Sequence, residues 1–273
     1  MTSTDTPPAG TAAAPGGRAA ITARTLRTDR WWVAPAVTFG VLLAFVVYST
    51  IRAFSNAAYF VPAYDYISPF YSPCLAANCA DGASHLGQPL GDLGIISPAL
   101  VVLVVPLGFR LTCYYYRKAY YRAFWLSPPA CAVAEPHASY TGETRFPLIF
   151  QNAHRWFFYL GLVFNAILTY DALIAFKGAH GGVGVGVGTL VLLVNAALLW
   201  LYSLSCHSCR HAIGGRLKHF SRHPVRYRLW TWVSRLNAHH MKFAWVSLVW
   251  VALADLYVSL VASGILTDLR IVN

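Results

Sequence analysis

The chain contains five apolar segments, each long enough to cross a lipid bilayer as a single helix. Such a helix needs about 20 apolar residues to span the hydrocarbon core. Of all residues, 57% are hydrophobic and only 11% are charged, against roughly 25% charged in soluble domains. Too little polar surface remains to cover a water-soluble protein. The expected spans are residues 32–54, 94–116, 156–176, 183–205 and 243–265. The sequence therefore predicts an all-α, multi-pass membrane protein, with a five-helix bundle over residues 26–273.

The basic residues predict how this bundle is oriented. Of the 21 Lys and Arg residues, 18 fall in the amino-terminal tail, in the segment between spans two and three together with Arg110 at its edge, and in the segment between spans four and five. The other three are Arg52, Lys177 and Arg270. Loops rich in Lys and Arg remain in the cytoplasm, so the amino terminus is expected inside and the carboxyl terminus outside. The net charge of +11 thus follows membrane topology, and nucleic acid is not an expected partner.

The segments outside the spans are short. Residues 1–25 are rich in Thr, Ala, Pro and Gly and are expected to be a disordered cytoplasmic tail. The outer loop carries Cys74 and Cys79, for which the oxidising outer face favours a disulfide over two free thiols.

Two acidic residues and a glycine pair lie within the expected spans. Asp171 and Asp255 are costly in a bilayer without a partner, and Arg52 is the expected structural partner. A proton path to the outer face is the alternative for these carboxylates. Gly184 and Gly188 form a G-x-x-x-G pair, which predicts a helix-packing face at the start of span four.

Cysteine and histidine residues gather at the expected inner ends of four spans. Cys113 ends the second span, His154 opens the third, and the motif SCHSCRH closes the fourth at residues 205–211. His239 and His240 open the fifth. Because an antiparallel bundle brings these ends to one depth, sulfur and imidazole ligands are expected to meet there. Zinc, haem and an iron–sulfur centre are all compatible with such residues. Two Cys with two His form the ligand set of a Rieske-type [2Fe–2S] centre.

Aromatic and basic residues occupy the inner interface as well. The stretch 113–125 reads CYYYRKAYYRAFW, which suits membrane anchoring, docking of an acidic soluble partner, or the wall of a quinone pocket. We expect a quinone site at this interface, with the following candidate residues: Arg30, Trp31, Tyr114, Tyr115 and Arg117.

Four motifs give the chain a resemblance to a known family. They are RTDRWW at 27–32, CYYYRKAYYR at 113–122, SCHSCRH at 205–211 and RLNAHHM at 235–241. Over about residues 25–273 the sequence resembles the single membrane-anchor subunit of actinobacterial, including mycobacterial, succinate dehydrogenase. The resemblance implies a haem-free branch with a Rieske-type cluster within the membrane. Spans one, two and four carry no internal His, unlike haem-binding anchors.

The resemblance also implies partners, ligands and location. A flavoprotein subunit and an iron–sulfur subunit would dock on the cytoplasmic side of a bacterial plasma membrane. Electrons from succinate would pass to menaquinone or ubiquinone, with no succinate-oxidising site in this chain. Cys206 and Cys209 would hold one iron, and His154 and His240 the other. The alternate ligands are Cys113, His207 and His211.

Two other functions remain open from the residues themselves. A haem-b quinone oxidoreductase subunit would use His154 and His240. A non-redox transporter or scaffold would use the intramembrane Asp residues and leave the Cys and His residues without metal.

Overall fold

The computed structural model describes residues 27–133, 136, 142–179 and 181–272, and within them the chain is a bundle of long helices. The expected tail at 1–25 lies outside these residues. Four helices are long and apolar enough to cross a membrane, and a bent helix pair makes a fifth candidate. The all-α membrane bundle is therefore confirmed. Its long straight helices are α1 Val33–Ser55, α5 His154–Ile174, α6 Val187–Leu204 and α9 His240–Ala262.

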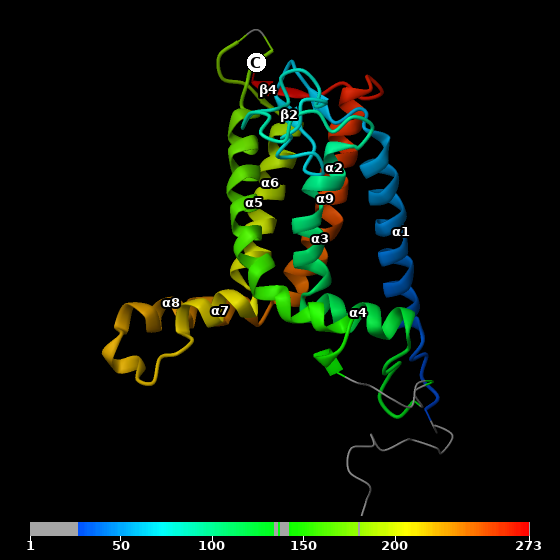
Figure 1. Cartoon of the computed structure of the whole chain (residues 1–273), viewed down its shortest axis with the longest axis vertical. Helices are drawn as coiled ribbons and strands as arrows, with labels where there is room; N and C mark the ends of the chain where they lie inside the picture. Colours follow the sequence, from blue (N-terminus) through cyan, green and yellow to red (C-terminus); the bar gives the residue numbers. More distant parts are fainter. Residues whose placement is uncertain (1–26, 134–135, 137–141, 180, 273) are drawn as a thin grey trace, which may run out of the picture.

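The bundle has two different ends, as Figure 1 shows. The end that carries the outer loop and the carboxyl-terminal strand is called the outer end here, and the opposite one the inner end. At the inner end three helices, α4 Tyr114–Phe124, α7 His207–Gly214 and α8 Pro224–Asn237, run across the bundle axis. The short elements are α7 His207–Gly214, α8 Pro224–Asn237, and the 3-10 turns at Gly142–Thr144, Leu148–Ala153 and Phe220–Arg222.

The second span is not the single helix expected at 94–116. It consists of α2 Pro98–Val102 and α3 Val104–Leu111, followed by α4 Tyr114–Phe124, which is bent away by 83°. Cys113 has an extended backbone and ends the apolar helix. From Tyr114 onward the side chains are aromatic and basic, so α4 suits the interface rather than the hydrocarbon core.

The glycine pair also differs from the expected packing motif. Helix α6 begins at Val187, so Gly184 lies before it, not within it. A side chain at Gly188 would collide with the ring of Tyr66, and one at Gly184 with the guanidinium of Arg270. The glycines therefore give room to the outer loop and the carboxyl-terminal strand, not to a neighbouring helix.

The outer loop forms a folded cap over the bundle. Strands β1 Phe60–Val61 and β2 Tyr66–Ile67 pair antiparallel, and β3 Val185–Gly186 pairs with β4 Arg270–Val272. The Cys74–Cys79 disulfide is present, as expected. Ser68 and Ser72 reach from the cap into the bundle, where they hydrogen-bond to Asp255 and Asp171 respectively.

The expected Arg52–Asp pair is confirmed for Asp255. The Arg52 Nε lies 2.8 Å from Asp255 Oδ2, and the Asp255 side chain is fully buried. Tyr48 donates a further hydrogen bond of 2.5 Å to the same carboxylate. Asp171 instead lies 3.2 Å from His85 Nδ1. Both carboxylates thus have partners at the outer end of the bundle.

Removal of the Asp255 charge should destabilise the protein strongly. Asp255→Asn leaves the Arg52 guanidinium buried without its counterion, which typically costs about 3–5 kcal/mol. The matched control is Asp65→Asn, because Asp65 pairs with the partly exposed Lys177 at 3.0 Å. Such surface pairs contribute at most about 1 kcal/mol. Thermal unfolding in detergent should show a much larger fall in Tm for Asp255→Asn, and equal falls would contradict the assignment.

Candidate metal centre

Four residues from four elements meet at the inner end of the bundle. Cys113 sits at the break between α3 and α4, and Cys206 precedes the first turn of α7. His154 and His240 are the first residues of α5 and α9. Cys113, Cys206 and His240 are at most 2% exposed. The break in the second span is therefore what brings a second cysteine to this site.

The four side chains form two cysteine–histidine pairs. The His154 Nε2 lies 3.1 Å from Cys206 Sγ, and the His240 Nε2 lies 3.5 Å from Cys113 Sγ. Among the described residues, no group of three or more such side chains surrounds a single ion position. A two-iron centre differs from a single ion, because its four ligands are divided between two irons.

Neighbouring groups hold both imidazole rings in place. Thr112 Oγ1 lies 2.9 Å from the His154 Nδ1, and Ser205 Oγ lies 2.7 Å from the His240 Nδ1. Each ring also stacks on an aromatic side chain: His154 on Phe109 with centroids 5.2 Å apart, and His240 on Tyr202 with centroids 5.1 Å apart. Such outer contacts orient metal-binding imidazoles, and they leave each Nε2 directed at a sulfur.

These supporting residues were missed in the sequence. Thr112 and Ser205 directly precede Cys113 and Cys206, which is the only signal that could have drawn attention to them. Phe109 and Tyr202 were not distinguishable from other interface aromatics, because their stacking depends on how the helices pack.

Cys209, expected to share an iron with Cys206, faces neither imidazole. It is buried on α7 in the same cluster as Cys113 and Cys206, but in the described part of the chain no hydrogen bond joins its thiol to His154 or His240. Cys113, an alternate in the sequence analysis, lies where the second sulfur was expected. The structure thus favours the set Cys113, Cys206, His154 and His240.

The other two histidines lie to the side of this group. His207 stacks on Tyr115, with ring centroids 6.3 Å apart. His211 Nδ1 accepts a hydrogen bond from Arg155. Burial, reinforced by the charge of Arg210, lowers the pKa of His207, so this ring is neutral near pH 7.

Of the five residues expected to line a quinone site, Tyr115 lies next to the group. Its ring centroid is 5.3 Å from that of His240. Arg117 instead pairs with Glu143 at 2.5 Å and packs over Tyr114. Arg30 and Trp31 lie directly before α1. None of the five residues lines the central cavity between the spans or the pocket around His207 and Trp230.

The electrostatics of the site favour neutral ligands in the absence of metal. Burial raises the pKa of the Cys206 thiol to about 12, with a further contribution from nearby Cys113. Iron binding would have to displace the thiol protons, as metals do at cysteine sites. Two thiols and two neutral imidazoles on separate elements fit the donor set of a Rieske-type centre.

Comparisons with known proteins agree with the resemblance seen in the sequence. Residues 33–264 match the family described as Actinobacterial succinate dehydrogenase subunit SdhC. Among solved structures, a chain of the Mycobacterium smegmatis Sdh1 complex in the apo form is 60% identical. That match covers 94% of this chain and 97% of the other, with a TM-score of 0.87. A search of curated proteins finds no match.

Thiol labelling of the metal-free protein should distinguish the cysteines. Cys131 is exposed, whereas Cys113, Cys206 and Cys209 are buried. Because the pKa of Cys206 is raised to about 12, its thiol remains protonated and unreactive between about pH 7 and pH 10. Maleimide should therefore modify Cys131 alone, and Cys131→Ser should abolish the labelling seen by peptide mass spectrometry. Modification of Cys206 that rises between about pH 7 and pH 9 would contradict its burial.

Proposed function

The chain belongs to the actinobacterial succinate dehydrogenase SdhC family, and we propose that it carries electrons from a docked iron–sulfur subunit to a membrane quinone. It is the membrane subunit of a succinate dehydrogenase complex. Electron transfer would run through a Rieske-type [2Fe–2S] cluster held by Cys113, Cys206, His154 and His240. The oxidation of succinate itself would belong to the soluble subunits in the cytoplasm, at the plasma membrane.

One observation carries this proposal: two buried sulfurs each face an imidazole nitrogen, that of half-buried His154 at 3.1 Å and that of buried His240 at 3.5 Å. When bound there, the cluster would supply single-electron transfer at a potential of about −150 to +300 mV. The residues keep this site dry and oriented. Thr112 and Ser205 fix the two rings, and Phe109 and Tyr202 cover them on the side of the bundle core.

The two alternatives have less support. A haem b needs two imidazole nitrogens directed at one iron, but here each Nε2 is directed at a cysteine sulfur. A transporter that uses intramembrane carboxylates would need Asp171 and Asp255 to be available. Both are instead bound to groups that hold the outer loop, namely Ser72 with His85, and Ser68 with Arg52.

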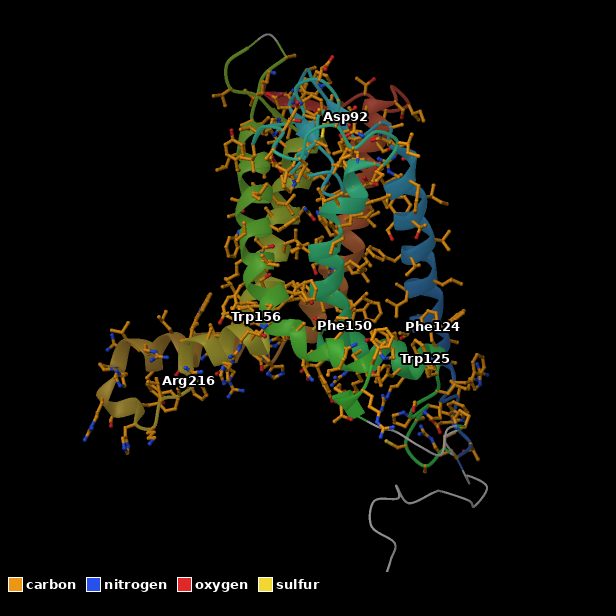
Figure 2. All side chains as sticks on the ribbon, in the orientation of Figure 1. Asp92, Phe124, Trp125, Phe150, Trp156 and Arg216 are labelled. Atoms are coloured by element: carbon orange, nitrogen blue, oxygen red, sulfur yellow. A yellow bond between two sulfur atoms is a disulfide. The ribbon has the colours of Figure 1, made fainter. Side chains whose placement is uncertain are left out.

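The inner end is suited to docking of soluble subunits. Helices α7 and α8 extend sideways from the bundle, and Figure 2 shows nitrogen-bearing side chains along this arm. Arg228 is exposed on α8, and Arg226 donates a hydrogen bond to the Ile213 carbonyl that holds the arm together. The resulting basic surface lies at the end where the four proposed ligands meet, so a docked electron donor would be close to them.

Loss of the imidazole ligands should stop quinone reduction but leave the oxidation of succinate by the soluble subunits unaffected. We expect His154→Ala together with His240→Ala to abolish quinone reduction, while succinate still reduces an artificial dye through the soluble subunits. Cys113→Ser and Cys206→Ser should remove a low-g signal from the electron paramagnetic resonance spectrum of the reduced complex. Cys209→Ser is the matched control and should retain it. If Cys209→Ser loses the signal and Cys113→Ser keeps it, the ligand assignment is wrong.

Charge reversal on the inner surface should loosen the complex. Arg122, Arg226 and Arg228 changed together to Glu should lower the yield of soluble subunits that co-purify with the chain, because attraction to an acidic partner is lost. The same three positions changed to Lys keep the charge and serve as the control. Arg228→Glu alone avoids any effect on the bond from Arg226 to Ile213. If the soluble subunits co-purify undiminished with both the triple Glu variant and Arg228→Glu, the docking surface lies elsewhere.

A further inference from the structure

The pocket around His207 and Trp230, called the basic pocket here, lies where the arm of α7 and α8 leaves the bundle. Its volume is about 440 Å³, and its walls come from the start of α5, from α7 and from α8. The guanidinium groups of Arg155 and Arg210 line it, and no acidic residue does. This size lies within the range of roughly 300–1,000 Å³ for small-molecule sites. The charge of the lining predicts an anionic ligand.

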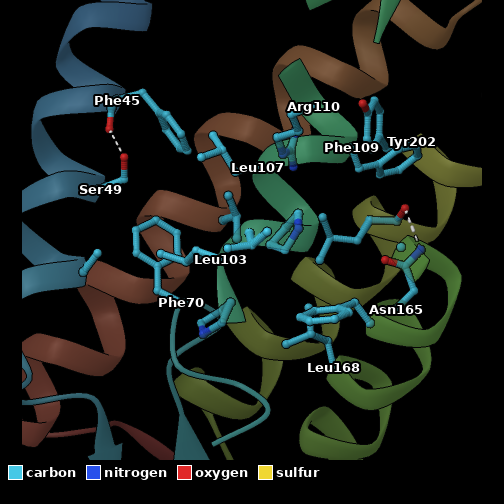
Figure 3. Close-up of a pocket in the computed structure, with 18 of the residues that line it drawn as sticks. Phe45, Ser49, Phe70, Leu103, Leu107, Phe109, Arg110, Asn165, Leu168 and Tyr202 are labelled. Atoms are coloured by element: carbon cyan, nitrogen blue, oxygen red, sulfur yellow. Dashed lines mark hydrogen bonds between the residues drawn. The ribbon is translucent and has the colours of Figure 1, made fainter. Parts of the chain in front are cut away.

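The central cavity between the spans has a different chemistry. Figure 3 shows apolar side chains along most of its labelled wall, among them Phe45, Phe70, Leu103, Leu107 and Leu168. Phe70 comes from the outer loop, which covers this cavity at the outer end of the bundle. The basic pocket is therefore a separate site at the opposite end of the molecule, and it suits a ligand of another class.

The two guanidinium groups lack a carboxylate partner in the described part of the chain. None of the ion pairs there involves Arg155 or Arg210. The Arg210 Nε is buried and has no hydrogen-bond acceptor among the described residues, which indicates an absent acceptor. The Arg210 guanidinium stacks over Trp230, 4.8 Å from the ring centroid. Stacking uses the flat face of the guanidinium and leaves the N–H donors of its edge to an oxyanion.

Contacts within the chain hold the walls of the basic pocket in place. Arg155 Nη2 donates a hydrogen bond to His211 Nδ1, so the hydrogen of the neutral ring lies on Nε2. Gly214 and Gly215 make room for these walls. A side chain at Gly214 would collide with the ring of Trp230, and one at Gly215 with His211. The pocket is thus formed before any ligand binds.

An apolar surface continues from the basic pocket along α5. Arg155 is the second residue of this helix, which is long and apolar enough to cross the membrane. Figure 2 labels Trp156 at the corner between α5 and the arm, and this side chain is 71% exposed. Tyr159 and Val163 are also exposed, and their spacing of four and eight residues places them on the same helix face as Arg155. Acyl chains could therefore lie along α5 directly beside the pocket.

We propose that the basic pocket binds the phosphate of an acidic phospholipid from the leaflet at the inner end, with Arg155 and Arg210 donating hydrogen bonds to its oxygens. Guanidinium groups bind phosphate oxygens through paired N–H donors, and basic pockets beside transmembrane helices suit acidic headgroups. A carboxylate of a soluble subunit would match the charge but would leave the apolar surface of α5 unused. The bound lipid would tie the start of α5 to the arm. This proposal goes beyond the electron route and does not depend on the cluster.

The test measures lipid binding to the purified, delipidated complex by native mass spectrometry. The probe is phosphatidylglycerol, and zwitterionic phosphatidylcholine with the same acyl chains is the reference. The parent complex should bind phosphatidylglycerol more tightly than phosphatidylcholine. Arg155→Gln together with Arg210→Gln should weaken the binding of phosphatidylglycerol about tenfold or more, because charge-assisted hydrogen bonds are lost.

The matched control removes two charges from the same arm. Arg216 and Arg222 are exposed and lie outside the pocket lining, so Arg216→Gln with Arg222→Gln should bind phosphatidylglycerol like the parent. Because Arg210 also stacks on Trp230, Arg155→Gln alone provides a variant that leaves this contact intact. It should still weaken binding about threefold or more. Equal affinities of the parent and the Arg155, Arg210 variant, or equal losses in the two double variants, would overturn the proposal.

Two further arms identify the occupant. Phosphatidylglycerol with a photoactivatable headgroup should label peptides from the start of α5 or from the arm, and labels confined to other helices would contradict the site. Millimolar inorganic phosphate should not displace the lipid, whereas its release would show that the pocket binds the free anion. If the Arg155, Arg210 variant loses soluble subunits but binds phosphatidylglycerol like the parent, the pocket belongs to the docking surface and the lipid proposal is wrong.

Discussion

A polar group within a bilayer must find its partner in the protein itself, because no water reaches the hydrocarbon core. The outer end of the bundle follows from this requirement. The Asp255 carboxylate forms an ion pair with Arg52 and accepts hydrogen bonds from Tyr48 and Ser68. These partners come from α1 and the outer loop. Asp171 accepts a hydrogen bond from Ser72 and lies next to His85, both residues of the same loop. Two buried carboxylates thus convert a loop into a fixed cap, and that cap closes the outer end of the central cavity.

The same requirement shapes the inner end, where the groups are neutral rather than charged. Each imidazole uses its Nδ1 on a hydroxyl and directs its Nε2 at a thiol. No carboxylate competes for these positions among the hydrogen bonds of the described residues. The site is therefore oriented before any metal arrives, which lowers the reorganisation that metal binding and electron transfer would require.

The sequence predicts the coarse architecture well, because hydropathy and the distribution of Lys and Arg act over whole segments. It also predicts that Arg52 pairs with an intramembrane Asp, since Arg52 is the single basic residue of the first span's outer end, but it does not decide between Asp255 and Asp171. It does not predict the bend after Leu111, because CYYYRK continues an acceptable helical pattern and the extended backbone at Cys113 comes from packing. For that reason spacing favoured Cys209, three residues from Cys206, although the cysteine that faces His240 is distant in the sequence.

The break at Thr112 and Cys113 links most of what is proposed for this chain. It turns α4 along the inner end, where basic residues suit a soluble partner, and it directs Cys113 toward His240. Thr112, one residue earlier, holds the ring of His154. Phe109 and Arg110, less than one turn before the break, face the cavity. Phe109, Arg110, Thr112 and Cys113 lie within five consecutive positions, so the cavity wall, the support of one imidazole ring and one proposed ligand all come from one short segment. A straight helix through residues 94–116 would separate these roles along its length, so the bend itself is the feature on which the proposed electron route depends.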